Sequence, residues 1–348
     1  MAVLSRPVIQ YPRHILDQQQ VLALVEKEFS GRRHADKAIQ LIKGMNIDRR
    51  YGVIPTERLL TSGTLEKRVE RDLTHALSLA VRTAREGITA AGLTARDIDS
   101  LIFVHSTGYG LPSLDAPLTA RLGLRRDVRK LTISQSGCAG GAVALARARD
   151  DVAAHPGAHV LIVAVELCSL LFHEEETKLE RMICCGLFGD GCAAAVVSGE
   201  DRDGIRLNSS WEYLLPDSLC ELQMTMGPEG FGCELAPGAP DHIKAALPEL
   251  MRWWRDTGHQ REDLKFLLAH TGGPRILRAI EEGLALDEKM LRPSYATLRE
   301  SGNTASVSVL DAISRGWDSL AQGDHGMITG FGPGMSLIAL EAQRTGPV

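Results

Sequence analysis

Short apolar segments alternate with helical patterns along this chain, and that alternation restricts its fold more than any other feature. The segments that we predict as buried strands cover residues 100–104, 128–133, 159–165, 193–197, 264–269, 326–330 and 336–340. Helical periodicity lies between them, over residues 65–91, 139–154, 243–257, 275–284 and 305–321. Strands that alternate with helices in this way predict an α/β fold.

The two halves of the chain follow a similar order of elements. In each half a predicted strand ends at a histidine, a later turn opens a helix, and further strands follow. The similarity is one of pattern, without a repeat of individual residues. We therefore predict two similar α/β halves, residues 1–205 and 206–348, divided where charged residues and glycine accumulate at 201–208.

Cys138 lies where a predicted strand stops and an alanine-rich helix begins, with glycine on both sides. A thiol at the first turn of a helix feels the partial positive charge of unpaired backbone N–H groups, which favours the thiolate. The glycines permit a sharp turn and a close approach of substrate to the backbone. A buried cysteine without a chemical role is the common alternative. The position predicts a nucleophile if the chain supplies partners for it.

Two residues in the second half are candidate partners for this thiol. His270 ends a predicted apolar strand and precedes a glycine loop, and the carboxyl ends of strands are where open α/β sheets place their sites. Asn303 lies in a turn before a predicted helix. It is either a helix N-cap, the more common role for asparagine at such a position, or an amide donor directed into the site.

Composition excludes several classes of function. The 348 residues, 44% hydrophobic and 24% charged, have the proportions of an ordinary globular protein. A net charge of -5 without a basic tract disfavours nucleic-acid binding, and no apolar run reaches the roughly 18 residues of a membrane span. The N-terminus lacks a signal-peptide pattern. The seven cysteines, all in the middle of the chain, fit a reducing, cytoplasmic environment, and we expect no metal site.

Five short motifs give the chain a resemblance to a known family in their order and spacing. They are Gly137-Cys138 with Ala139-Gly140-Gly141, Leu187 to Gly191, His270 to Pro274, Gly302-Asn303 and Gly330 to Gly334. On these motifs the chain resembles the type III polyketide synthases, the chalcone-synthase-like branch of the thiolase superfamily, and most of all their bacterial members. The resemblance spans nearly the whole chain.

The resemblance implies a thiolase-like fold with α-β-α-β-α layers, a homodimer, and a catalytic triad of Cys138, His270 and Asn303. Cys138 as thiolate, paired with His270 as imidazolium, would take the acyl group of an acyl-CoA starter. Malonyl-CoA would then lose CO₂, and His270 and the Asn303 amide would stabilise the enolate. Coenzyme A thioesters are thus expected as substrates, without a cofactor. No feature of the sequence indicates a carrier protein as the acyl donor.

The resemblance also assigns residues to substrate binding. Phe188 matches a family phenylalanine that lies between the CoA tunnel and the cavity. Lys37 matches a phosphate-binding cation, and we expect Lys43 and Arg275 to supply further positive charge for the CoA phosphates. Gly272, Gly273, Gly332 and Pro333 belong to the matched motifs around the site.

Several positions differ from chalcone synthases, where their counterparts line the cavity or the dimer interface. Cys233 replaces a phenylalanine at the cavity mouth, Met224 replaces a glycine, Cys168 and Leu171 replace two threonines, and Leu111 replaces the methionine that crosses the dimer interface. A cavity of different shape predicts a different starter or fewer extensions.

Four alternative functions share features with this sequence. An acyltransferase or single-condensation enzyme with the same triad agrees with the sequence as well. A ketoacyl synthase that starts fatty acid synthesis would carry His-Gln-Ala-Asn where this chain has His270-Thr271-Gly272-Gly273. A papain-like protease shares the order Cys, His, Asn, but the α/β alternation and the glycine pair after Cys138 argue against it. A non-catalytic thiolase-like subunit would usually have lost the nucleophile.

Overall fold

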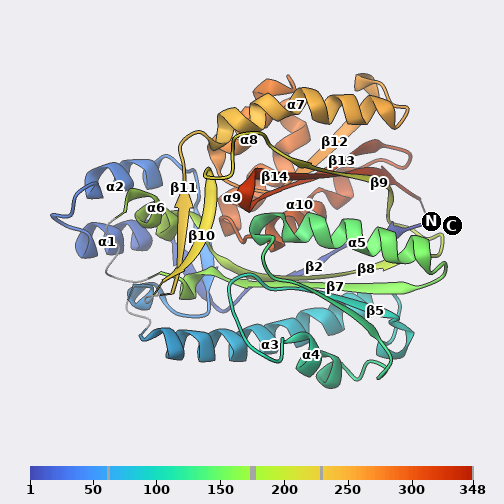
Figure 1. Ribbon diagram of the computed structural model, residues 1–348, viewed down its shortest axis with the longest axis horizontal. Helices are drawn as coiled ribbons and strands as arrows, with labels where there is room; N and C mark the ends of the chain where they lie inside the picture. The colour runs from blue at the N-terminus through green and yellow to red at the C-terminus, as the bar shows by residue number, and fades with distance from the viewer. Residues whose placement is uncertain (61–62, 173–177, 228–229, 347–348) are drawn as a thin grey trace.

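The computed structural model in Figure 1 describes residues 1–60, 63–172, 178–227 and 230–346, without the side chains of 225–227, 230, 231, 233–235 and 288. Its strands are β1 (Val3–Leu4), β2 (Val8–Gln10), β3 (His14–Asp17), β4 (Arg49–Gly52), β5 (Ser100–Val104), β6 (Arg129–Ile133), β7 (His159–Leu167), β8 (Asp190–Ser198), β9 (Ile205–Leu214), β10 (Leu222–Gly227), β11 (Gly230–Leu235), β12 (Leu264–Ala269), β13 (His325–Gly332) and β14 (Ser336–Arg344).

The α-helices are α1 (Gln18–Glu28), α2 (Ala35–Lys43), α3 (Leu65–Ala90), α4 (Asp115–Leu122), α5 (Gly140–Ala154), α6 (Leu179–Leu187), α7 (Ala239–Asp256), α8 (Pro274–Gly283), α9 (Arg292–Ser301) and α10 (Val307–Gly316). Two short 3₁₀ turns, η3 (Gly137–Ala139) and η4 (Cys168–Leu170), follow the ends of β6 and β7. None of the helices in the described ranges has the length and apolar character needed to cross a membrane.

Ten of the described strands form one mixed sheet, in the order β12-β13-β14-β9-β1-β8-β7-β5-β6, with β2 paired beside β8. The pairs β3-β4 and β10-β11 form two separate two-stranded sheets. On one wing, β5 runs parallel to β6 and β7, and β8 is antiparallel to β7. On the other wing, β12 runs parallel to β13, and β14 is antiparallel to β13. The short strand β1 joins the wings because it pairs with both β8 and β9.

Both faces of the central strands are buried, which explains why they appear in the sequence as continuous apolar runs. In β7, Val160 and Ile162 pack in one hydrophobic core, whereas Leu161 and Val163 pack in another. The core that contains Val160 and Ile162 also holds the apolar side chains of α5 and α10 and one face of β12, β13 and β14. Helices α5 and α10 therefore form a layer between the two wings (Figure 1).

The outer faces of the wings are covered by other helices. Helix α3 packs on β7 and β8, and Figure 1 shows α7 and α8 on the far side, above β12 and β13. The units α5–β7–β8 and α10–β13–β14 follow the same order of helix, strand and antiparallel strand. The predicted thiolase-like layering of α, β, α, β, α is confirmed.

Most predicted elements lie close to their expected bounds. Strands β5 and β12 coincide with the predicted segments, whereas helix α7 begins four residues before the predicted residue 243. Strand β9 falls in the region predicted as the division between halves, and it was not expected as a strand. Because β1 pairs across this division, a single sheet runs through both halves, and the separation into residues 1–205 and 206–348 stays a prediction.

Candidate active site

Cys138 lies in the tight turn η3 between β6 and α5, and its side chain is partly exposed. Gly137, just before it, has a φ of 49°, and a Cβ there would lie 2.8 Å from the Pro333 ring. A Cβ on Gly141 would lie 2.2 Å from the carbonyl oxygen of Ser306, the residue that precedes α10. Glycine is needed before the thiol because Gly137 has a left-handed backbone, and after it because Gly141 lies where the two central helices are in direct contact.

The Asn303 side chain links this turn to the second half of the chain. Its amide Nδ2 lies 3.8 Å from Cys138 Sγ. Its Oδ1 accepts a hydrogen bond of 2.9 Å from the backbone N–H of Ala305, so the amide nitrogen is the end that faces the thiol. Ser306 and not Asn303 is the N-cap residue of α10, whereas the Asn303 amide nitrogen is directed at the Cys138 sulfur.

The backbone of Asn303 is held by the segment that follows α6. The Asn303 N–H donates to the Leu187 carbonyl at 2.9 Å, and the Gly189 N–H donates to the Asn303 carbonyl at 3.0 Å. This short bridge places Phe188 opposite Asn303. The motif at residues 187–191 thus holds the backbone of the Gly302-Asn303 motif through these two hydrogen bonds.

His270 follows the end of β12, and its side chain is buried. Its backbone N–H donates to the Thr329 carbonyl in β13 at 2.8 Å. Burial lowers the pKa of His270 to about 3, while a backbone hydrogen bond with Ala305 acts in the opposite direction. The imidazole is therefore neutral near pH 7 unless an adjacent anion holds a proton on it. The imidazolium that we expected depends on the charge of the Cys138 thiolate.

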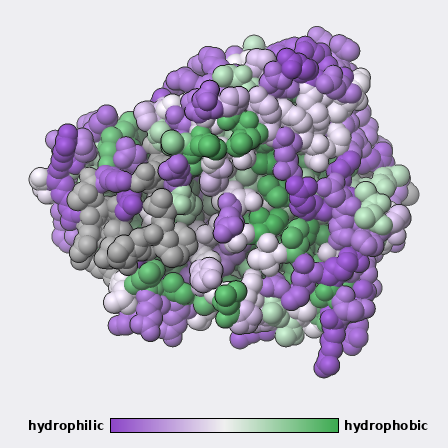
Figure 2. Space-filling model, in the orientation of Figure 1, coloured by the Kyte–Doolittle hydropathy of each residue, from purple (hydrophilic) through white to green (hydrophobic). Residues whose placement is uncertain are grey.

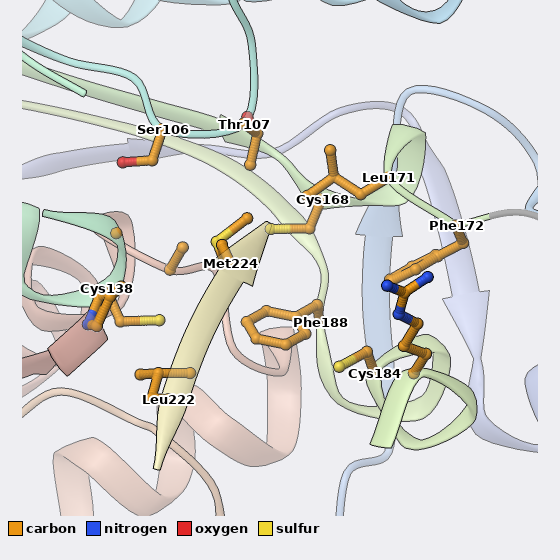
Figure 3. A pocket seen from close by; sticks show the side chains of 14 residues that line it. Ser106, Thr107, Cys138, Cys168, Leu171, Phe172, Cys184, Phe188, Leu222 and Met224 are labelled. Atoms are coloured by element: carbon orange, nitrogen blue, oxygen red, sulfur yellow. The ribbon is translucent and has the colours of Figure 1, made fainter. Parts of the chain in front are cut away.

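Two cavities meet at the thiol. The first encloses about 700 Å³, counted with its opening to solvent. Its described lining consists of Ser106, Thr107, Gly137, Cys138, Cys168, Leu171, Phe172, Arg181, Cys184, Phe188, Leu222, Met224, Ala305 and Pro333. Figure 3 shows Cys138 at one end of this cavity and Phe172 and Leu171 at the other, with Phe188 and Met224 between them.

The second cavity encloses about 480 Å³ on the same basis. His270, Asn303 and Gly272 line it together with Cys138. Phe188 and Leu222 belong to both linings, so the phenyl ring lies at the junction of the two spaces. On the face shown in Figure 2, hydrophobic side chains gather near the middle of the molecule and polar ones surround them. A substrate at the thiol would be surrounded mainly by apolar groups.

Sequence analysis did not predict several residues that line the first cavity. Ser106 and Thr107 follow the carboxyl end of β5, so the rule that sites lie at strand ends was a usable signal for them. Phe172, Arg181 and Cys184 lie after η4 and on α6, and no pattern in the sequence marks them as neighbours of Cys138.

The buried Glu166 holds the part of the cavity wall formed by Ser106 and Thr107. Its carboxylate accepts hydrogen bonds from the backbone N–H groups of Ser106 and Thr107, at 3.0 and 3.1 Å, and from the Ser306 hydroxyl. Burial raises the pKa of Glu166, and His105 together with these hydrogen bonds opposes the increase. The loop that lines the cavity is thus tied to the start of α10.

Two matched glycines support the site without lining either cavity. Gly273 precedes α8 with a φ of 139°, a value that favours glycine. A Cβ on Gly332 would lie 2.6 Å from the Ala139 Cβ, so the end of β13 packs directly against the nucleophile turn. The motif at residues 330–334 is explained by this close approach.

The remaining predicted residues lie away from the cavities or outside the described side chains. Lys37 in α2 and Arg275 in α8 are exposed, and neither is among the described residues that line the two cavities. Lys43 forms an exposed ion pair with Glu26 at 3.4 Å. Leu111 is 83% exposed on the surface. Cys233 pairs with Met224 in the β10–β11 hairpin, but its side chain lies outside the described part.

Comparison with known proteins identifies one family along most of the chain. The sequence profile described as "Chalcone and stilbene synthases, N-terminal domain" matches residues 12–201. The profile described as "Chalcone and stilbene synthases, C-terminal domain" matches residues 206–343. Together the two profiles cover both cavities and all three residues of the predicted triad.

Individual relatives cover nearly the full length. The 1,3,6,8-tetrahydroxynaphthalene synthase of Streptomyces coelicolor is 36% identical over 97% of this chain and 90% of its own. The phloroglucinol synthase of Pseudomonas fluorescens is 32% identical over 97% of each. The crystal structure of the tetrahydroxynaphthalene synthase from Streptomyces coelicolor A3(2), described as a bacterial type III polyketide synthase, superposes with a TM-score of 0.96, at 34% identity, over 99% of each chain.

Proposed function

The chain belongs to the chalcone and stilbene synthase family of type III polyketide synthases, and from this premise we propose that Cys138, His270 and Asn303 carry out its decarboxylative condensation of CoA thioesters. The observation that supports these roles best is the Asn303 amide, whose nitrogen faces the Cys138 sulfur because its oxygen is bound to the Ala305 N–H.

In the loading step, the Cys138 sulfur attacks the carbonyl carbon of a starter acyl-CoA. The thiol proton passes to His270 as the new carbon–sulfur bond forms. The tetrahedral intermediate then expels the CoA sulfur, which takes a proton back from His270, and the acyl group stays on Cys138 as a thioester. A neutral histidine in the resting state, as burial enforces, suits this proton transfer.

In the extension step, malonyl-CoA binds with its thioester oxygen between His270 and the Asn303 amide. The bond to the carboxylate breaks, CO₂ leaves, and the electron pair forms an enolate at that oxygen. His270 and the Asn303 amide are already oriented toward that oxygen, so they stabilise its negative charge better than water molecules, which would first have to reorient. The ring of Phe188 adds an apolar surface at the junction of the cavities, which favours release of neutral CO₂ over retention of the carboxylate.

The enolate carbon then attacks the Cys138 thioester, which lengthens the chain, still on CoA, by one two-carbon unit and releases Cys138 as the thiolate. The extended chain returns to Cys138, and repetition followed by ring closure gives an aromatic or pyrone product. Growth proceeds into the first cavity, past Met224 and toward Phe172. The described relatives are named for the aromatic products tetrahydroxynaphthalene and phloroglucinol, which supports a small aromatic product here.

Exposed side chains also have roles in CoA binding and in dimer formation. Lys37 and Arg275, both exposed, supply positive charge for the phosphates of CoA.

The chain acts as a homodimer in which the partner subunit covers Leu111. This side chain is 83% exposed, and a leucine with so little burial is a candidate interface residue. The seven cysteines suit a reducing compartment, so we place the enzyme in the cytoplasm.

One reaction series tests this function against the acyltransferase alternative. The purified protein is incubated with malonyl-CoA alone and with a panel of acyl-CoA starters, and CO₂ release and products are measured by mass spectrometry. We expect CO₂ release and products longer than the starter by at least two malonyl-derived units. Transfer of the starter without chain extension would favour the acyltransferase, and the absence of both decarboxylation and transfer would overturn the proposal.

A further inference from the structure

A second group of side chains suited to chemistry lies at the opposite end of β13 from the active site. It consists of His259, in the loop between α7 and β12, His325 at the start of β13, and Glu341 in β14. One possible ligand atom from each residue lies within 4.8 Å of the others. Phe331, near the other end of β13, lines the catalytic cavity, so this cluster has no part in the mechanism above.

The carboxylate of Glu341 is held in a fixed position within the cluster. His259 Nε2 lies 2.8 Å from Glu341 Oε1. The Asn208 amide donates to the same oxygen at 3.0 Å, and the Ser209 hydroxyl donates to Oε2 at 2.7 Å. The His259 ring stacks on Trp254 with a centroid distance of 4.3 Å. Two of the three groups are thus oriented by neighbours that do not belong to the cluster.

His325 leaves one of its ring nitrogens without a partner. Its Nδ1 is buried and makes no hydrogen bond to the described atoms, while Nε2 lies 3.0 Å from the side-chain amide of Gln343. An unsatisfied buried nitrogen costs free energy, so a site that retains one points to a missing ligand. The rings of His259 and His325 lie 4.7 Å apart and are inclined by 49°, which allows their nitrogens to converge on one ion.

We propose that His259, His325 and Glu341 bind a divalent transition-metal ion, for which Zn²⁺ is the best match. Two imidazole nitrogens and one carboxylate oxygen form a common zinc ligand set, with water as a fourth ligand. Ligand atoms around zinc lie about 3.3 Å from one another, as bond lengths near 2.0 Å require, whereas those of the cluster lie within 4.8 Å, so the histidine side chains rotate toward the carboxylate when the ion binds. Asn208, Ser209 and Gln343 then act as the hydrogen-bonding partners that orient zinc ligands.

The ion would connect the loop before β12 to the start of β13 and to the later part of β14. Sequence analysis did not predict this site, because the three ligands come from separate elements and show no spacing typical of a metal site. The site also departs from our expectation that the chain binds no metal.

Zn²⁺ alone is the probe for the test. The untagged full-length protein is freed of metal and titrated with ZnCl₂ in competition with a chromophoric chelator. Variants His325→Ala and Glu341→Gln remove one ligand each, and Glu341→Gln keeps the shape of the side chain. His155→Ala is the matched control, because His155 forms a histidine–carboxylate pair with Asp151 at 2.9 Å outside the cluster. Circular dichroism establishes that each variant is folded.

We expect one Zn²⁺ per chain in the wild type and in His155→Ala, and an affinity at least tenfold weaker in His325→Ala and in Glu341→Gln. Co²⁺ substitution gives a second readout, because thiolate ligands would add an intense charge-transfer band that nitrogen and oxygen ligands lack. Absence of stoichiometric binding, equal affinity in all four proteins, or a thiolate band that persists in His325→Ala would overturn the proposal.

Discussion

The amide nitrogen of Asn303 lies 3.8 Å from the Cys138 sulfur, while the oxygen of the same amide accepts the Ala305 N–H at 2.9 Å. This arrangement allows only one orientation of the amide, with the donor toward the thiol. Ala305 itself has a φ of 46°, a left-handed conformation that costs a residue with a Cβ about 1–2 kcal/mol. This strained residue is the one whose N–H orients the Asn303 amide.

The Asn303→Asp variant tests the donor. An ionised aspartate replaces the N–H donor with an acceptor and places negative charge near the enolate oxygen, so the rate of malonyl-CoA decarboxylation falls by roughly 10²- to 10³-fold. The rate is measured as CO₂ release at saturating malonyl-CoA. Asn46→Asp, at an exposed loop position, is the control and keeps the wild-type rate. Decarboxylation at the wild-type rate in Asn303→Asp would remove the amide from the mechanism.

Met224 tests how the cavity limits chain length. Its side chain lies between Cys138 and Cys168 in the first cavity (Figure 3). Met224→Ala opens space there, and we expect products longer by at least one two-carbon unit or a shift toward larger starters. Met224→Leu preserves volume and should leave the product profile nearly unchanged. Products are measured by liquid chromatography and mass spectrometry. An unchanged profile in Met224→Ala would show that another part of the wall sets the length.

His270 makes stability depend on pH in a defined direction. The pKa of its ring is about 3 in the folded chain and about 6.5 in the unfolded chain. Between these values the unfolded state binds more protons, so stability decreases as pH falls. Relative to His270→Gln, the wild type should lose about 2 kcal/mol of unfolding free energy between pH 7 and pH 5. Urea unfolding at both pH values measures the difference, and parallel pH dependence in the two proteins would contradict the buried neutral histidine.

Gly141 tests the contact between the two central helices. A Cβ at this position would lie 2.2 Å from the Ser306 carbonyl oxygen, so Gly141→Ala must separate α5 from the start of α10. We expect a loss of about 3 kcal/mol or more in unfolding free energy, together with loss of activity. Gly44→Ala is the matched control, because its nearest contacts would be 3.6 Å away. Equal stability of the two variants would show that the helices are not in tight contact.

The sheet could be predicted from the sequence where burial imposes an obvious pattern. Strands β5 and β12 are buried on both faces, so each appears as an apolar run with clear ends. Strand β9 lacks that pattern, because its residues beyond Leu207 are mostly half-buried or exposed. Its place beside β14 depends on pairing with residues more than a hundred positions away, which local periodicity does not encode.

The site could be predicted in part for a similar reason. Cys138, His270 and Asn303 lie at strand ends and turns, where glycine marks an unusual backbone. The far wall of the cavity includes Phe172, which follows η4, and Cys184 on α6. Tertiary packing brings both toward Cys138, and the local sequence pattern does not encode it. The protonation state of His270 could not be predicted from the sequence either, because it depends on how completely the ring is buried.

The acyl adduct on the protein tests the central claim most directly. Wild type, Cys138→Ala and Cys168→Ala are incubated with an accepted acyl-CoA, and intact mass and peptide mapping locate the label. Cys168 is the matched control because it is another thiol of the same cavity. We predict one acyl group on Cys138 in the wild type and in Cys168→Ala, and none in Cys138→Ala, which makes no polyketide. An adduct or polyketide formation that survives in Cys138→Ala would contradict the assignment of Cys138 as the nucleophile.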